Sequence, residues 1–386
     1  MRTNDFLLVQ DLLCRPPLQS WARSIQEGLE SEIGPGRQNS THIASLLNLA
    51  AFVEILRGDK NAAKAICEAE LAWVASLASK TAGSLTISAL AIQPWINIGR
   101  LLRIDGRCQE ALSHFDLVLK RPDREPLLLG PCRIQESEWE DLLASDVSLN
   151  LWNVYLVDSL KTYFRCRRFD VALRFIAELR EVEPRCHDNL LLEGQIISQI
   201  GLGDYERSYQ LAKSRSDQDV LDTVVLMLYQ AQCLTELDRH DDVLTLTRDL
   251  KTFALLGGLD ALSPSIAMRC LEKLGAVLER IEQKVQAAQV YEYAYRLAVT
   301  ENDQPHEISF LRALARQVRC EEKQKLEDMR LPLLKDCYYN DVLQSEGLSG
   351  QRWCEAFGDL RSAVSMVTRG VAATQPDSRP FGVGVH

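Results

Sequence analysis

The chain has 386 residues, of which 44 are Lys or Arg and 54 are Asp or Glu, so its formal net charge is −10. Glycine (20) and proline (13) are scarce, and this argues against a many-stranded sandwich, barrel or propeller. The acidic balance argues against general nucleic-acid binding, which needs a net basic face to displace counterions from phosphates.

The sequence contains no segment typical of an export signal or a membrane span. The start, from Met1 to Cys14, carries Asp5 and Asp11 among short apolar runs. The longest uncharged run, between Lys80 and Arg100, is too polar to cross a membrane. The eleven cysteines are scattered without a C-x-x-C pair. We therefore expect a cytoplasmic protein with reduced, mostly buried thiols and no membrane partner.

Helical periodicity dominates the chain from its start. Residues 1–40 are expected to form one amphipathic helix from Leu18, carrying Trp21, Ile25 and Leu29, followed by a linker. A helix from His42 to Leu56, a Gly58-Asp59 turn and a helix from Asn61 to Leu71 come next. Because this long-helix, short-turn, long-helix unit recurs and no useful strand pattern appears, the sequence predicts an all-α fold.

The clearest copy of this unit lies between Trp95 and Val118. Small residues at Gly99 and Ala111 allow two helices to approach closely, and Leu102 and Phe115 fill the space around that contact. Gly106 suits the turn. These residues resemble the tetratricopeptide repeat (TPR), whose unit of about 34 residues has this order.

The same register recurs between residues 41 and 300, about six times in all. Its second-helix positions are Ala63, Ala111, Ala172, Ser208, Val243 and Ala287, at steps of 48, 61, 36, 35 and 44 residues. The longer steps place insertions near 79–86, 122–148 and 253–265. The resemblance implies a TPR-like right-handed superhelix of stacked helix hairpins.

The C-terminal region, residues 301–370, is expected to supply capping helices. A charged helix from His306 to Met329 stops before Pro332, and Trp353, Phe357, Leu360 and Val364 line one face of another. These helices would cover the last apolar surface of the array or form a seam in a homodimer. The tail, 371–386, is expected to be flexible.

Motifs for catalysis, cofactors and metals are not found in the sequence. There is no phosphate-binding loop, and the six histidines never occur as H-x-x-x-H. Cys108, Cys166 and Cys233 lie in or beside helix hairpins and are expected to pack as thiols. We therefore expect no cofactor, no metal and no catalytic residue.

The TPR resemblance implies that the first helix of each unit lines a concave groove. Carried over to this sequence, the groove residues are Gln93, Asn97, Arg100, Arg103, Lys161, Phe164, Arg165, Tyr229, Gln232, Arg269, Lys273 and Arg280. Several cations share one helix face by their spacing, which favours an anion-binding groove on an acidic chain. A solvated face with paired charges is the alternative, and Glu272 and Glu279 favour it in the last unit.

The sequence therefore predicts a non-catalytic scaffold that binds a protein or peptide segment, acidic in character. Cationic side chains would hold carboxylates, while Phe164 and Tyr229 would supply apolar contacts. An alternative is a helical-repeat enzyme or biosynthetic accessory protein, with His114, a cysteine and a carboxylate in a pocket covered by 122–148. A third reading is a regulator that senses a small peptide or metabolite in the same groove.

Overall fold

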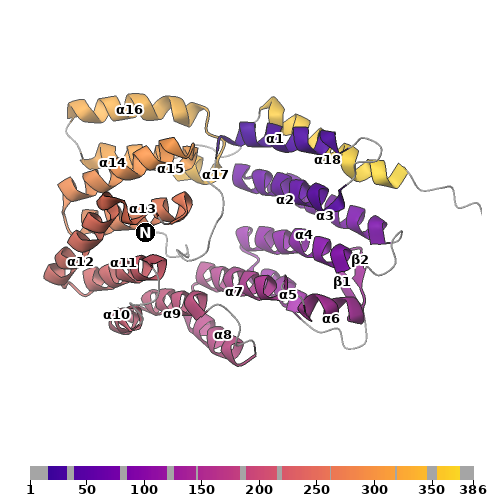
Figure 1. The fold of residues 1–386 in the computed structure, drawn as a ribbon, viewed down its shortest axis with the longest axis horizontal. Coiled ribbons are helices and arrows are strands. Elements are labelled where there is room, and N and C mark those ends of the chain that lie inside the picture. Colours follow the sequence, from indigo (N-terminus) through magenta and orange to yellow (C-terminus); the bar gives the residue numbers. More distant parts are fainter. Residues whose placement is uncertain are drawn as a thin grey trace, which may run out of the picture. The chain divides into compact units, whose positions relative to one another are not determined.

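The protein is all-α, as the sequence predicted. A computed structural model describes residues 16–32, 39–78, 85–119, 126–144, 147–182, 188–214, 220–260, 262–317, 320–345 and 354–373. Its helices are α1 (Leu18–Ser31), α2 (Ser40–Arg57), α3 (Lys60–Ala78), α4 (Leu85–Ile104), α5 (Cys108–Leu119), α6 (Glu136–Ala144), α7 (Val147–Arg165), α8 (Phe169–Val182), α9 (Asp188–Leu202), α10 (Tyr205–Lys213), α11 (Val220–Glu236), α12 (His240–Phe253), the π-helical η1 (Ala254–Gly258), α13 (Pro264–Arg280), α14 (Lys284–Thr300), α15 (Gln304–Gln317), α16 (Cys320–Lys335), α17 (Asn340–Ser345) and α18 (Glu355–Ala373) (Figure 1). In these stretches no helix is both long and apolar enough to cross a membrane.

The chain divides into two compact units. Unit 1 comprises Met1–Leu18, Leu102–Asp116 and Asp146–Gly350. Unit 2 comprises Gln19–Leu101, Leu117–Ser145 and Gln351–His386. The boundaries fall inside α4 and α5, so the C-terminal turn of α4 belongs to unit 1 with most of the candidate groove residues.

One turn geometry joins successive helices in both units. A residue with positive φ follows the first helix, its N–H bonds back three residues, and the next N–H bonds back five, which is the Schellman pattern. The residues with positive φ are Gly58, Gly106, Arg167, Gly203, Asp238, Glu282 and Asn302. The residue after each one accepts the first backbone hydrogen bond of the next helix, so two or three residues between the helices suffice to reverse the chain.

The first six of these turns lie five residues before the six second-helix positions that the sequence singled out. Those six residues, from Ala63 to Ala287, are 0% exposed. The six positions therefore occupy equivalent places in the hairpins that these turns form. Below, the first helices are α4, α7, α9, α11 and α13, and the second helices are α5, α8, α10, α12 and α14.

Within unit 1 the helices pack in chain order, from α7 to α16. Each first helix from α7 to α11 also contacts the first helix of the following hairpin (Figure 1). Close approach within a hairpin is visible at Gly275 of α13, where a Cβ atom would lie 2.4 Å from the ring of Tyr291 on α14. The apolar core of this unit runs continuously from Leu156 to Leu314.

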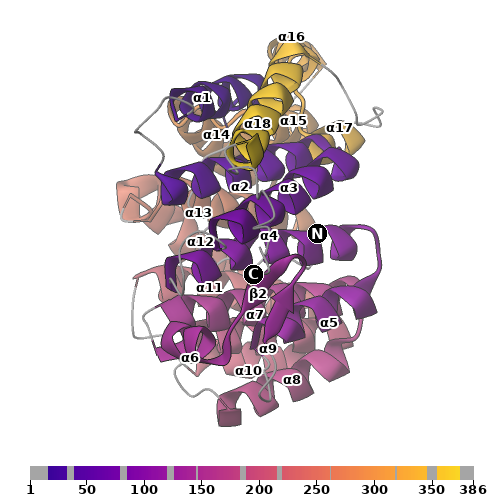
Figure 2. The same cartoon turned by 90° about the vertical axis from the view of Figure 1, so that its right-hand side faces the viewer.

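Unit 2 contains the first hairpin, α2–α3, and the last helix, α18, which packs against both of them (Figure 2). Arg361 of α18 donates to Glu54 at 2.7 Å and to Asp59 at 2.6 Å, and the Arg57 guanidinium lies 4.8 Å from the centre of the Phe357 ring. Glu54 and Arg57 are almost fully buried, so this ionic cluster is part of the core of the unit.

This placement differs from the expected C-terminal cap. The stretch from His306 onwards forms two helices, α15 and α16, and α16 continues through Pro332 to Lys335. The helix that carries Phe357, Leu360 and Val364 packs against α2 and α3, the first hairpin. Phe357 and Leu360 are 0% exposed inside unit 2, so they do not provide an accessible seam for a homodimer. Trp353 and residues 374–386 of the tail lie outside the described residues.

The described part of the 122–148 insertion is a packed element of unit 2. Strands β1 (Leu127–Leu129) and β2 (Cys132–Ile134) form a short antiparallel hairpin, visible in Figure 2, and α6 follows. β2 packs on α3, where the Cys132 thiol donates to the carbonyl of Leu71, and Trp139 of α6 is 0% exposed. This is the arrangement of an extra packed layer, and residues 120–125 and 145–146 lie outside the described part.

Candidate functional site

The candidate groove residues of α4 take part in a chain of polar contacts within unit 2. The Asn97 Oδ1 atom accepts from Gln93 Nε2 at 3.3 Å and from Arg100 Nη1 at 3.1 Å, and Asn97 Nδ2 donates to Asn48 Oδ1 at 3.2 Å. Asn97 is only 4% exposed. Its amide therefore joins α4 to α2, and it is engaged inside the unit at the position where the resemblance placed a ligand contact.

This chain ends at a buried acid on α3. Asn48 Nδ2 donates to Glu70 Oε1 at 3.0 Å, while Glu70 Oε2 is buried and has no hydrogen-bond partner among the described residues. Burial raises the pKa of Glu70 well above its ordinary value, and the hydrogen bond from Asn48 offsets only part of that effect. Burial therefore favours the neutral form of the Glu70 carboxyl in the interior of unit 2.

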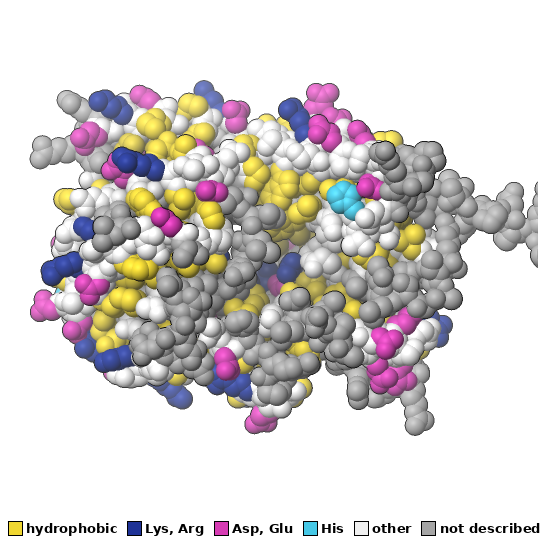
Figure 3. Space-filling model, viewed as in Figure 1, with side chains coloured by type: hydrophobic (Ala, Val, Ile, Leu, Met, Phe, Trp, Pro, Cys, Tyr) yellow, Lys and Arg dark blue, Asp and Glu magenta, His cyan; other side chains and the backbone are white. Residues whose placement is uncertain are grey.

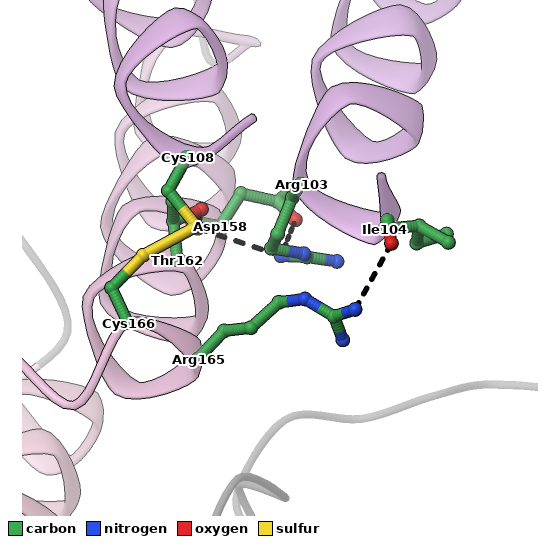
Figure 4. Close-up of a disulfide and its surroundings, with 7 residues drawn as sticks. All are labelled: Arg103, Ile104, Cys108, Asp158, Thr162, Arg165 and Cys166. Carbon is green, nitrogen blue, oxygen red and sulfur yellow. Dashed lines mark hydrogen bonds and ion pairs between the residues drawn. A yellow bond between two sulfur atoms is a disulfide. The ribbon is translucent and has the colours of Figure 1, made fainter. Parts of the chain in front are cut away.

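In unit 1 the end of α4 is tied to α7. Arg103 Nη1 donates to Asp158 Oδ1 at 2.9 Å, and both side chains are largely buried (Figure 4). Arg165 Nη2 donates to the carbonyl of Ile104 at 3.0 Å. Arg103 and Arg165 therefore connect α4 to α7 within unit 1.

Cys108 and Cys166 form a disulfide beside these contacts (Figure 4). The expectation that every cysteine is a reduced thiol is contradicted for this pair. Cys108 begins α5 and Cys166 directly follows α7, and the two backbone turns bring them together across 58 residues of sequence. Five other cysteines are buried thiols, as expected: Cys67, Cys132, Cys233, Cys270 and Cys337.

Residues of three successive first helices meet in a polar cluster. Tyr229 of α11 donates from its hydroxyl to Glu193 Oε1 of α9 at 2.6 Å. Lys273 Nζ of α13 lies 3.6 Å from the centre of the Tyr229 ring, a cation–π contact. Arg269 is one helical turn from Lys273, and Gln232 is one turn from Tyr229. We call Glu193, Tyr229, Gln232, Arg269 and Lys273 the first-helix cluster.

Burial corrects two of the predicted roles. Phe164 is 2% exposed and stacks on Phe169 with ring centres 5.7 Å apart. Tyr229 is also 2% exposed. Both aromatic rings are therefore packed within unit 1 and do not offer an open apolar contact. Lys161, Arg269 and Lys273 keep partial exposure on the same helices.

The remaining predicted cation, Arg280, forms a two-point ion pair with Glu236 of α11. Glu279 likewise accepts from Arg316 of α15 at 3.2 Å. On the face shown in Figure 3, cationic and acidic side chains are interspersed over the left-hand helices. At α13, the last of the first helices, the observed ion pairs therefore agree with the alternative of a solvated helix face with paired charges.

The thiols nearest the cluster are poor nucleophiles. Burial raises the pKa of Cys270 to about 12, against the opposing effect of Arg269 and Lys273. Burial also raises the pKa of Cys233 to about 11. Within the described stretches, no group of three or more His, Cys, Asp and Glu side chains is arranged to hold a metal ion.

Sequence reasoning missed Glu193, Asn48 and Glu70. Glu193 had a usable signal, because it is a lone acid directly after the apolar run Leu190–Leu192 and before Gly194. A charged residue at the centre of an apolar helix is buried only when a partner satisfies it. Asn48 and Glu70 carry no such signal, since their partners lie on other helices.

The chain was compared with models of protein families and with curated proteins. No family model matches the chain, and no curated protein matches it.

Proposed function

We propose that unit 1 is a TPR-like array whose first-helix surface binds a peptide or protein segment, without catalysing a reaction. The bound segment is acidic in this proposal, and its carboxylates contact Lys161, Arg269 and Lys273. The protein would act as a cytoplasmic scaffold that holds a partner.

The observation that carries this proposal is the recurrence of one hairpin geometry. Six equivalent turns stand at the spacing predicted from the TPR-like register, and successive first helices contact one another in unit 1. A row of neighbouring helices of this kind gives a long, largely preformed surface, which is how helical-repeat proteins bind extended segments.

The first-helix cluster supports a binding role for this surface. Glu193, Tyr229 and Lys273 come from three hairpins and hold one another in place. Side chains fixed by their neighbours lose little conformational entropy when a ligand binds. The partial exposure of Lys161 and Arg269 leaves cationic groups at the edge of this fixed region.

A peptide-binding experiment tests the proposal. The full chain would be screened against a displayed peptide library, and selected peptides would be measured by isothermal titration calorimetry. Lys161→Glu combined with Arg269→Glu should weaken acidic peptides by roughly a hundredfold, because two attractive charges become repulsive.

The matched control carries the same charge change on second helices. Arg174→Glu with Arg296→Glu alters two exposed side chains of α8 and α14 that pair with Asp170 and Glu292. Peptide affinity should stay within about twofold in this control at physiological ionic strength. Equal losses in both double variants would show that only the net charge matters, and would overturn the proposed surface.

A further inference from the structure

A separate pocket lies on the other helices of unit 1, between α12 and the α13–α14 hairpin. It has a volume of about 300 Å³ and is lined by Leu244, Thr247, Arg248, Lys251, Leu278, Gln283 and Gln286. The four α12 residues follow the i, i+3, i+4, i+7 spacing of a single helix face. The opposite wall is built by the recurring turn, in which the Gln283 N–H bonds to the carbonyl of Leu278 at 2.9 Å.

The charged groups of this pocket are all cationic. Arg248 and Lys251 line it, and none of the described carboxylates does. Lys251 Nζ donates to Gln289 Oε1 of α14 at 3.0 Å. The Arg248 guanidinium donates no hydrogen bond to any residue that the structure describes.

Arg248 differs in this respect from three other exposed arginines of these hairpins. Arg174 and Arg296 each pair with an acid four residues away on their own helix, and Arg239, just before α12, pairs with Asp242 of that helix. Around Arg248 the corresponding positions hold Leu244, Thr245, Lys251 and Thr252. The helix therefore supplies no acid for this guanidinium, and its charge is directed at solvent in the pocket.

The remaining lining suits the body of a small molecule. Leu244 and Leu278 give apolar contact, and the carboxamides of Gln283 and Gln286 make no hydrogen bond within the described residues. The volume lies at the lower end of the range for small-ligand sites and holds about ten water-sized groups. A guanidinium binds a carboxylate or phosphate through two parallel hydrogen bonds, and an adjacent ammonium adds charge.

We propose that this pocket binds a small organic anion. Arg248 and Lys251 hold its carboxylate or phosphate group, while the leucines and glutamines contact the rest of the molecule. This site is distinct from the first-helix surface, and it stands whether or not that surface binds a peptide.

Ligand-observed NMR and calorimetry on the full chain test the site with three probes: phenyl phosphate, phenylacetate and the neutral benzyl alcohol. At least one anion should bind at millimolar concentration or below, and benzyl alcohol should bind more weakly. Binding of one anion alone identifies whether phosphate or carboxylate is preferred. The Arg248→Gln, Lys251→Gln double variant should bind roughly tenfold more weakly or worse.

The control variant, Arg174→Gln with Arg296→Gln, removes two exposed cations elsewhere on the second helices. It should retain the wild-type affinity within about twofold, because these guanidinium groups are paired and remote in sequence from the pocket. Circular dichroism would verify that both double variants stay folded. Absence of binding by both anions, or equal affinity in wild type and the pocket variant, would overturn the proposal.

Discussion

The Tyr229 hydroxyl on α11 donates a 2.6 Å hydrogen bond to the Glu193 carboxyl on α9, although 36 residues separate them in the sequence. Both side chains are almost fully buried, and Lys273 of α13 lies over the tyrosine ring. Tyr229 thus connects the first helices of three consecutive hairpins. We expect this contact to contribute to the stability of unit 1, and it also forms part of the proposed binding surface.

Tyr229→Phe should lower the free energy of unfolding by about 1.5–3 kcal/mol, because it removes the hydrogen bond and leaves the Glu193 oxygen buried. Urea unfolding followed by circular dichroism measures this change. Tyr209→Phe is the matched control, since the Tyr209 hydroxyl makes no hydrogen bond within the described residues. Its effect should stay below about 0.5 kcal/mol. Equal effects of the two substitutions would contradict the assigned role of the hydroxyl.

Glu70 should make unit 2 less stable as the pH rises. Its pKa is raised in the folded state by burial, so the neutral carboxyl favours folding. That contribution is fully present below the ordinary pKa of 4.5 and is lost as the pH rises through the raised value. Glu70→Gln keeps the shape and stays neutral, so its stability relative to wild type should increase steadily with pH. Urea unfolding of both proteins over a pH series measures the difference, and parallel curves would contradict it.

Local sequence patterns indicated where the helix hairpins lie, but not which residues far apart in the sequence contact one another. The second-helix positions from Ala63 to Ala287 could be recognised because helical spacing and small residues leave a periodic signal. In three of the turns the residue with positive φ could not be picked out, since Arg167, Asp238 and Glu282 adopt this conformation without being glycine. The disulfide and the contact of Arg361 with Glu54 join residues far apart in sequence, and no local pattern records such pairs.

The recurring turns predict opposite effects of two exposed substitutions. At Gly203, φ is 79° and no atom lies within 4 Å of an added Cβ, so Gly203→Ala tests backbone strain alone. It should lower the free energy of unfolding by about 1–2 kcal/mol. Glu282 has φ of 60° at the equivalent place, and Glu282→Gly should raise stability by up to about 1 kcal/mol. Thermal unfolding measures both, and changes of the same sign would contradict the equivalence of the turns.

Arg361 is expected to hold α18 on the first hairpin of unit 2. Burial alone would raise the pKa of Asp59, but hydrogen bonds from the Ala62 N–H and from Arg361, with the charges of Arg361 and Arg57, bring it below the ordinary value. Arg361→Met keeps the aliphatic stem and removes the charge, which should cost about 3 kcal/mol, since Glu54 keeps only Arg57.

Hydrogen exchange measured by mass spectrometry should then accelerate across Glu355–Ala373. Arg369→Met is the control, because Arg369 is an exposed cation of the same helix. It should leave the exchange of α18 unchanged. If Arg361→Met also left it unchanged, apolar packing of Phe357 and Leu360 alone would hold the helix.

Reduction of the Cys108–Cys166 disulfide should lower the free energy of unfolding of unit 1. The bond closes 58 residues of chain, and loop-closure entropy assigns about 4 kcal/mol to a loop of that length. Dithiothreitol should therefore lower the urea midpoint of the wild-type protein, and Cys108→Ser with Cys166→Ser should reproduce the reduced midpoint and no longer respond to the reductant. Arg103 and Arg165 still connect α4 to α7 after reduction, so the helical circular dichroism of the native state should persist. A wild-type midpoint that stays unchanged while mass spectrometry shows both thiols free would contradict this contribution.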